Sequence, residues 1–106
     1  MDSSMRYRPR TDANQLAIVD VLRKAGCSVQ VLAVLGNGCP DLLIGKHGVN
    51  ILLEIKNPKS RPSQRTLTDD ERGWHAAWLG QVAVVESAEE ALQLIKEECG
   101  SWAYDN

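Results

Sequence analysis

The segment DLLIGKHGVNILLEIK, residues 41–56, constrains the fold more than any other part of the chain. Two apolar runs flank His47 and Gly48, and such runs separated by two turn residues are typical of a β-hairpin. With His47 and Gly48 as the turn, residues whose numbers sum to 95 face each other across the hairpin. The predicted strands are Cys39 to Lys46 and Val49 to Lys56.

This register places Asp41 directly opposite Glu54, with their Cβ atoms about 5 Å apart. Alternation along the strand puts Lys56 on the same face as Glu54, while the other face is apolar. The apolar positions are Leu42, Ile44, Ile51, Leu53 and Ile55. Neighbouring carboxylates repel each other, so this pair predicts either a bound cation or a proton held by one acid.

Magnesium suits such a pair because it binds through one or two carboxylates and keeps several waters. A simpler alternative is that Asp41 and Glu54 are separately solvated and that Lys56 neutralises them at a sheet edge. A turn shifted by one residue would also move Asp41 to the opposite face.

The remaining segments predict three helices and two further strands. The first helix begins with Asp12 as N-cap and Gln15 in a capping box, and it ends at Gly26. The other predicted elements are a strand at residues 28–35, a loop at 57–65, a helix at 67–80 that Thr68 and Glu71 cap, a strand at 81–85 and a helix that Ser87 and Glu90 cap. The order is α-β-β-β-α-β-α, which predicts an α/β (α+β sandwich) fold with a mixed sheet flanked by helices.

Length and composition favour one soluble domain. The chain has 106 residues, of which 43% are hydrophobic and 25% charged, close to the average for globular proteins. The sequence contains neither an apolar run long enough to span a bilayer nor a secretory signal, so we expect a cytoplasmic protein without a membrane partner. Three separated cysteines predict neither a zinc site nor a disulfide framework.

Basic residues are concentrated in the first part of the chain. Residues 1–65 contain ten Lys or Arg against five Asp or Glu, whereas residues 66–106 contain two against nine. The basic residues cluster at 6–10 and 56–65, which suggests an anionic partner such as DNA. Two alternatives are an ordinary solvated surface and an interaction domain whose acidic half binds a basic partner.

The pattern of Pro40-Asp41, twelve intervening residues and Glu54-Ile55-Lys56 resembles the motif of the PD-(D/E)xK nuclease superfamily. Within it, the chain looks most like the small phage-type VRR-NUC proteins, which are related to Holliday-junction resolvases. The resemblance covers about residues 11–98 and implies a restriction-endonuclease-like core. It divides the chain into a basic arm (1–10), a nuclease-like domain (11–99) and a short tail (100–106).

The resemblance implies that Asp41 and Glu54 bind Mg²⁺, or Mn²⁺, together with the backbone carbonyl of Ile55, and that Lys56 orients the attacking water. It further implies an endonuclease acting on branched or otherwise structured DNA, a homodimer, and a location in a bacterium or a phage-infected cell. Many relatives add a glutamate from the first helix. Here the candidates are Gln15 and Asp12, so a catalytically weak or inactive DNA-binding module is the alternative.

Other residues have candidate roles in DNA binding or proton transfer. The basic side chains expected to contact the DNA backbone are Lys59, Arg61, Arg65, Arg8 and Arg10. His47 and His75 are candidate general bases, although a turn position and an exposed helix position explain them more simply. Trp74 and Trp78 could stack on bases, but their helical spacing favours a place in the core.

Overall fold

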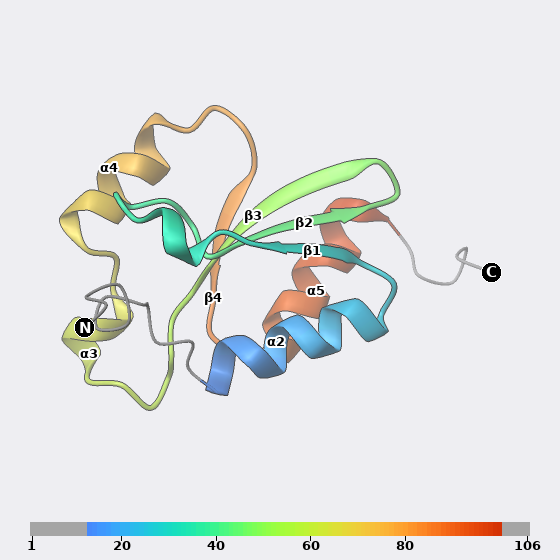
Figure 1. Cartoon of the computed structure of the whole chain (residues 1–106), viewed down its shortest axis with the longest axis horizontal. Helices are drawn as coiled ribbons and strands as arrows, with labels where there is room; N and C mark the ends of the chain where they lie inside the picture. Colours follow the sequence, from blue (N-terminus) through green and yellow to red (C-terminus); the bar gives the residue numbers. More distant parts are fainter. Residues whose placement is uncertain (1–12, 101–106) are drawn as a thin grey trace, which may run out of the picture.

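The computed structural model describes residues 13–100, which form a small α+β domain around a four-stranded mixed sheet (Figure 1). The strands are β1 (Ser28–Val31), β2 (Leu42–Lys46), β3 (Val49–Ile55) and β4 (Val82–Val85), in the spatial order β1-β2-β3-β4. The first three strands are antiparallel, and β4 is parallel to β3. A parallel neighbour requires a crossover, and the crossover here contains α3 (Pro62–Arg65) and α4 (Asp69–Ala77).

The hairpin forms in the predicted register. Leu42 pairs with Leu53 and Ile44 pairs with Ile51. His47 and Gly48 have φ values of 54° and 80°, and a type I′ turn requires positive φ at both central residues. The turn type therefore fixes which side chains share a face of the hairpin.

The apolar face of the hairpin forms the core together with α2 (Ala13–Lys24) and α5 (Ala88–Cys99). In Figure 1 these two helices lie side by side along one face of the sheet. The largest fully buried apolar side chains come from both helices and from the hairpin: Ile18, Leu22, Leu42, Ile44, Ile51, Leu53 and Ile95. No helix within residues 13–100 has the length and apolar character needed to cross a bilayer.

Helix α4 lies over the other face of the sheet. Trp74 of this helix and Trp78, which follows its last residue, line a pocket with Leu43 and Leu52, whose side chains point away from the core by strand alternation. The loop before β2 packs against the start of α4, since a Cβ atom at Gly38 would lie 2.4 Å from the backbone oxygen of Asp70. Gly38 also has a φ of 84°. This close approach brings the first turn of α4 beside the end of the hairpin.

Several predicted boundaries are wrong. The strand predicted at residues 28–35 ends at Val31 and is followed by the 3-10 helix η1 (Ala33–Leu35), because its partner β2 begins only at Leu42, opposite Val31. The predicted loop at 57–65 includes the short helix α3, which has Pro62 in its first turn as helix starts favour. The N-cap predicted at Asp12 lies outside the described residues.

Both other predicted helix starts are confirmed. Thr68 and Glu71 form a complete capping box at α4, and the Ser87 hydroxyl accepts a hydrogen bond from the Glu90 N–H (3.1 Å) at α5. Replacing Ser87 with Ala should lower the free energy of unfolding by about 1 kcal/mol, because an N–H of the first turn loses its acceptor. Urea unfolding beside Ser28→Ala, a change at an exposed strand position, measures this effect. An equal loss in both variants would contradict it.

Candidate metal and catalytic site

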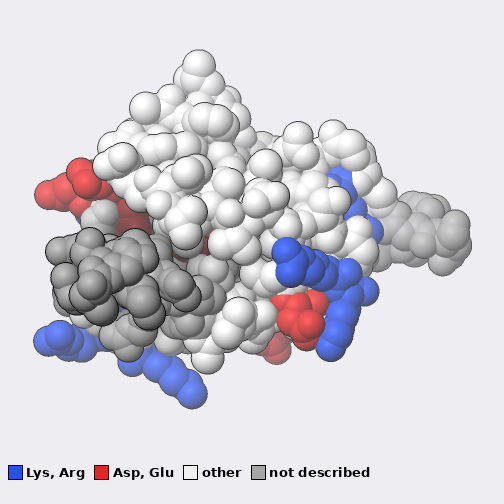
Figure 2. Space-filling model, in the orientation of Figure 1, with Lys and Arg blue, Asp and Glu red and all other residues white. Residues whose placement is uncertain are grey.

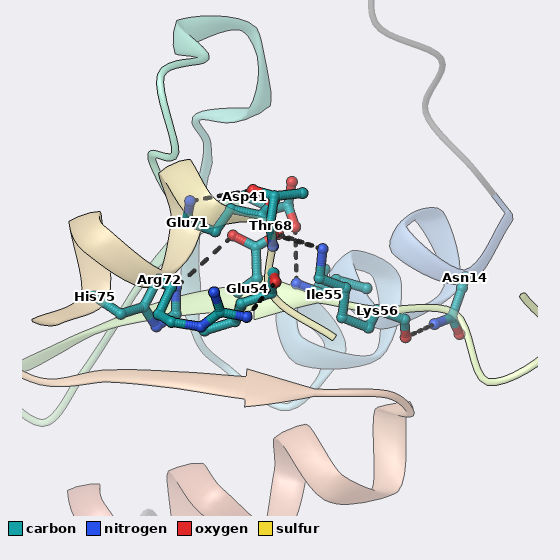
Figure 3. A network of polar contacts seen from close by, with 10 residues as sticks. Asn14, Asp41, Glu54, Ile55, Lys56, Thr68, Glu71, Arg72 and His75 are labelled. Carbon is teal, nitrogen blue, oxygen red and sulfur yellow. Dashed lines mark hydrogen bonds and ion pairs between the residues drawn. The ribbon is translucent and has the colours of Figure 1, made fainter. Parts of the chain in front are cut away.

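Asp41, Glu54 and Lys56 converge at the end of the hairpin remote from its turn (Figure 3). Asp41 precedes β2, and its Oδ2 accepts a hydrogen bond from the backbone N–H of Ile55 (2.7 Å). This bond holds the Asp41 carboxyl against the residue that follows Glu54. Lys56 Nζ lies 3.8 Å from Glu54 Oε2. The sequence predicted this grouping, and the side chains lie on one face as the register requires.

Glu71 joins this group, although the sequence indicated only a capping role for it. Its Oε1 accepts hydrogen bonds from the backbone N–H of Thr68 (2.9 Å) and from Lys56 Nζ (2.7 Å). The same carboxylate therefore caps α4 and holds the lysine of the site. No sequence signal distinguishes Glu71 from the neighbouring Asp69 and Asp70 in this second role, because it depends on where α4 packs.

His75 also belongs to the site, so its prediction as an exposed helix residue is wrong. Its side chain is only 12% exposed, and Nε2 lies 3.9 Å from Glu54 Oε1. Residues four apart share a helix face, so α4 directs Glu71 and His75 toward the same part of the sheet. Glu54 Oε1 and His75 Nε2 are both buried without a hydrogen-bond partner. Burial lowers the pKa of His75, which favours the neutral imidazole.

The surroundings of Glu54 favour its protonated form. Glu54 is 3% exposed, so the alternative in which the two acids are separately solvated does not hold for it. Burial, followed by the negative charges of Asp41 and Glu71, raises the pKa of Glu54 to about 9. Burial also raises the pKa of Asp41.

The three carboxyl groups are not equivalent. For Glu71, burial acts to raise the pKa, but the hydrogen bonds from Lys56 and Thr68 outweigh it and lower the pKa. Glu71 is thus the ionised partner of Lys56. The single ammonium group of Lys56 does not also neutralise the carboxyl pair of Asp41 and Glu54. Such a pair is stabilised by a shared proton or by a cation.

The donor set fits a hard divalent cation that keeps most of its waters. Glu54 Oε1 is a buried carboxyl oxygen without a hydrogen bond, and oxygen ligands of this kind suit Mg²⁺. Within residues 13–100, His, Cys, Asp and Glu side chains form no group of three arranged to hold a metal. The two carboxylates would therefore need waters or backbone oxygens to complete a coordination shell.

The other predicted metal ligands have different positions. The backbone N–H of Ile55 contacts Asp41. The role of the Ile55 carbonyl as a metal ligand stays a prediction. Gln15 is buried in the first turn of α2. Its neighbour Asn14 donates hydrogen bonds to the backbone oxygens of Lys56 (3.2 Å) and Glu86 (3.0 Å). The start of α2 is therefore fixed against the ends of β3 and β4, near the site.

The predicted DNA contacts are only partly described. Lys59 and Arg61 are exposed in the segment that follows Lys56, whereas Arg65 is half-buried and donates a hydrogen bond to the Pro58 backbone oxygen (3.0 Å). Figure 2 shows Lys and Arg side chains at the lower left, where α3 and the preceding loop lie in Figure 1. Arg8 and Arg10 lie outside the described residues.

Of the remaining predictions, the one for His47 is confirmed and the one for Trp74 and Trp78 is wrong. His47 is a turn residue as predicted, and its Nδ1 lies 2.7 Å from the Cys99 backbone oxygen. Trp74 and Trp78 stack on each other with ring centroids 4.7 Å apart, but they are not part of the core, and Trp78 is 45% exposed. The core prediction is wrong because α4 lies on the side of the sheet away from α2 and α5, where none of its own residues becomes buried.

Comparisons of the chain with protein-family models, with curated proteins and with solved structures found no significant match.

Proposed function

We propose that this protein is a metal-dependent endonuclease that hydrolyses DNA phosphodiester bonds. The observation that carries the proposal is the pair of adjacent carboxyl groups of Asp41 and Glu54, with the Lys56 ammonium 3.8 Å from Glu54. Burying two acids and a lysine at the end of a hairpin has a desolvation cost, so their presence there favours a functional role. Metal-assisted attack on a phosphodiester uses such a set.

Each side chain has a role in the proposed reaction. Asp41 and Glu54 would hold Mg²⁺ or Mn²⁺, and Glu54 would lose its proton when the ion binds. A bound divalent ion supplies a water of lowered pKa and stabilises charge on the phosphate. Lys56 would orient that water or the phosphate as a compact positive charge. Glu71 would act as a positioning residue because it fixes the Lys56 ammonium at 2.7 Å.

Three further features are part of the proposal. The α+β domain would correspond to the restriction-endonuclease-like core, since three antiparallel strands, a crossover helix and a parallel fourth strand follow that order. The exposed Lys59 and Arg61 would bind the DNA backbone beside the site. We also propose a homodimer that acts on branched or structured DNA in the cytoplasm.

A DNA-binding module without hydrolysis is the second candidate. The observation that favours it is that Lys56 already donates a hydrogen bond to Glu71, so its ammonium is partly neutralised. In addition, many proteins with the similar motif carry a glutamate in the first helix, and the buried candidate here is the neutral Gln15. Such a module would bind DNA with an affinity that falls steeply with salt.

The test is cleavage of a labelled four-way junction and a labelled linear duplex with Mg²⁺, with Mn²⁺ and with EDTA. Wild type should cut only with metal, and Lys56→Met should lose roughly 10²-fold or more of the rate because the positive charge near the phosphate is removed. Lys96→Met, at an exposed position of α5, is the control. Absence of cutting by folded wild type, with salt-sensitive binding, would favour the binding module instead.

A further inference from the structure

A pocket of about 470 Å³ opens on the α4 face of the sheet, beside the carboxyl pair. Strands β2 and β3 contribute Leu43, Asn50 and Leu52, α4 contributes Trp74, and Trp78 follows the last residue of α4. Its volume lies in the range of small-molecule sites, which are mainly apolar with a few polar groups. Nothing in the proposed hydrolysis uses this pocket.

The pocket and the carboxyl pair are contiguous. Leu52 lines the pocket and lies two residues before Glu54, on the same face of β3. Cys39 also lines the pocket. It stands two residues before Asp41 in the chain, so the wall of the pocket continues to both acids of the pair. A ligand in the pocket would therefore lie next to a phosphate held at the site.

The indole ring of Trp74 packs against one face of the Trp78 indole in the wall of the pocket. Trp74 and Trp78 are stacked with an interplanar angle of 18°, and Trp78 remains 45% exposed. A Cβ atom at Gly80 would lie 2.9 Å from Trp78 Nε1, so glycine at this position allows the indole to fold back over the chain. An exposed indole fixed in one orientation is suited to stack on another planar ring.

The charge of the surroundings favours a neutral planar ligand. Figure 2 shows no charged side chain over the segment that joins α4 to β4, which consists of Trp78, Leu79, Gly80 and Gln81. The side-chain amide of Asn50 is a polar group of the pocket lining, whereas the Gln81 amide donates a hydrogen bond to Glu98 of α5 (2.8 Å). A nucleobase combines a planar apolar face with a polar edge, and its own nucleotide carries the phosphate that the adjacent acidic site would process.

We propose that this pocket holds an unpaired nucleobase adjacent to the scissile phosphate, stacked on Trp78. The inference rests on the proposed function and specifies its substrate class. A base within a duplex is paired and stacked on both sides, so it must leave the duplex to enter a pocket. The protein should therefore prefer single-stranded or junction-exposed nucleotides over fully paired DNA.

Fluorescence anisotropy with end-labelled oligonucleotides in EDTA tests the pocket without cleavage. The probes are a twelve-residue oligothymidylate and the same backbone with abasic sites throughout. Wild type should bind the oligothymidylate about fivefold or more tightly than the abasic strand, because stacking on an aromatic side chain depends on the base. Trp78→Ala should reduce this ratio to about one. Leu79→Ala, at a fully exposed neighbouring position, should leave it unchanged.

Gly80→Ala is the second variant, since it displaces the Trp78 ring without removing it, and it should also reduce the ratio. Equal affinity of wild type for both strands would overturn the proposal. So would a change from dimer to monomer on Trp78→Ala in sedimentation velocity without a change in the ratio, because the surface would then join two copies of the chain. Base-dependent binding without cleavage would overturn only the nuclease, and cleavage without base-dependent binding would overturn only the pocket.

Discussion

Replacing Glu54 with Gln should abolish metal-dependent DNA cleavage, with a loss on the order of 10³-fold or more. The amide keeps the shape of the side chain but cannot bind a cation as a carboxylate does, so the several kcal/mol that a metal contributes to the transition state are lost. Affinity for DNA in EDTA should stay within about threefold of wild type, because phosphate contacts are assigned to the basic segment and not to Glu54. The measurement is the single-turnover cleavage rate together with DNA affinity.

Glu89→Gln is the matched control, since it makes the same chemical change at an exposed position of α5. It should retain the full cleavage rate. If Glu54→Gln cuts DNA at the wild-type rate, Glu54 is not a metal ligand and the proposed mechanism fails. If wild type and variant bind DNA equally and neither cuts, the binding module is the better description.

In the absence of metal, wild-type protein should lose stability as the pH rises from 7 to 9. The folded state holds a proton on Glu54, whose pKa is about 9, while the unfolded chain has released it above the ordinary value of 4.5. Unfolding therefore releases a proton in this window, and the free energy of unfolding falls by about 1.4 kcal/mol per pH unit until Glu54 ionises. The expected loss is roughly 2 kcal/mol.

The neighbouring groups do not reverse this trend. Asp41 also has a raised pKa and acts in the same direction. The pKa values of Glu71 and His75 are lowered from ordinary values of 4.5 and 6.5, so their contributions change below pH 7. Their stabilisation is lost on acidification, outside the window of the measurement. Glu54 therefore dominates the pH dependence between pH 7 and 9.

Urea unfolding in EDTA at pH 7, 8 and 9 measures this effect. Glu54→Gln should remove most of the slope and should be the more stable protein at pH 9, because a neutral amide replaces the buried acid that must ionise. Glu89→Gln should keep the wild-type slope. Parallel pH profiles for wild type and Glu54→Gln would show that Glu54 is already ionised in the folded protein and that its surroundings do not raise its pKa.

The hairpin and the face on which its charges lie follow from the amino-acid sequence alone. A two-residue turn at His47 and Gly48 leaves one register, and the alternation of strand side chains then groups Asp41, Glu54 and Lys56. The helix caps at Thr68 and Ser87 are also predictable from the sequence, because a capping hydrogen bond forms between residues three apart in the chain. These features depend on local geometry and on a period of two.

The residues that surround that group depend on how α4 packs against the sheet. Glu71 and His75 reach the site because α4 packs on the face of the sheet opposite α2 and α5. Their spacing of four residues along the helix would be the same if α4 packed on the other face, so this spacing does not predict the contact. Because of the same packing, Trp74 and Trp78 lie in the wall of the pocket and not in the core. The periodicity of the sequence predicts that α4 has an apolar side. It does not predict which face of the sheet that side packs against, because this depends on contacts between residues far apart in the chain.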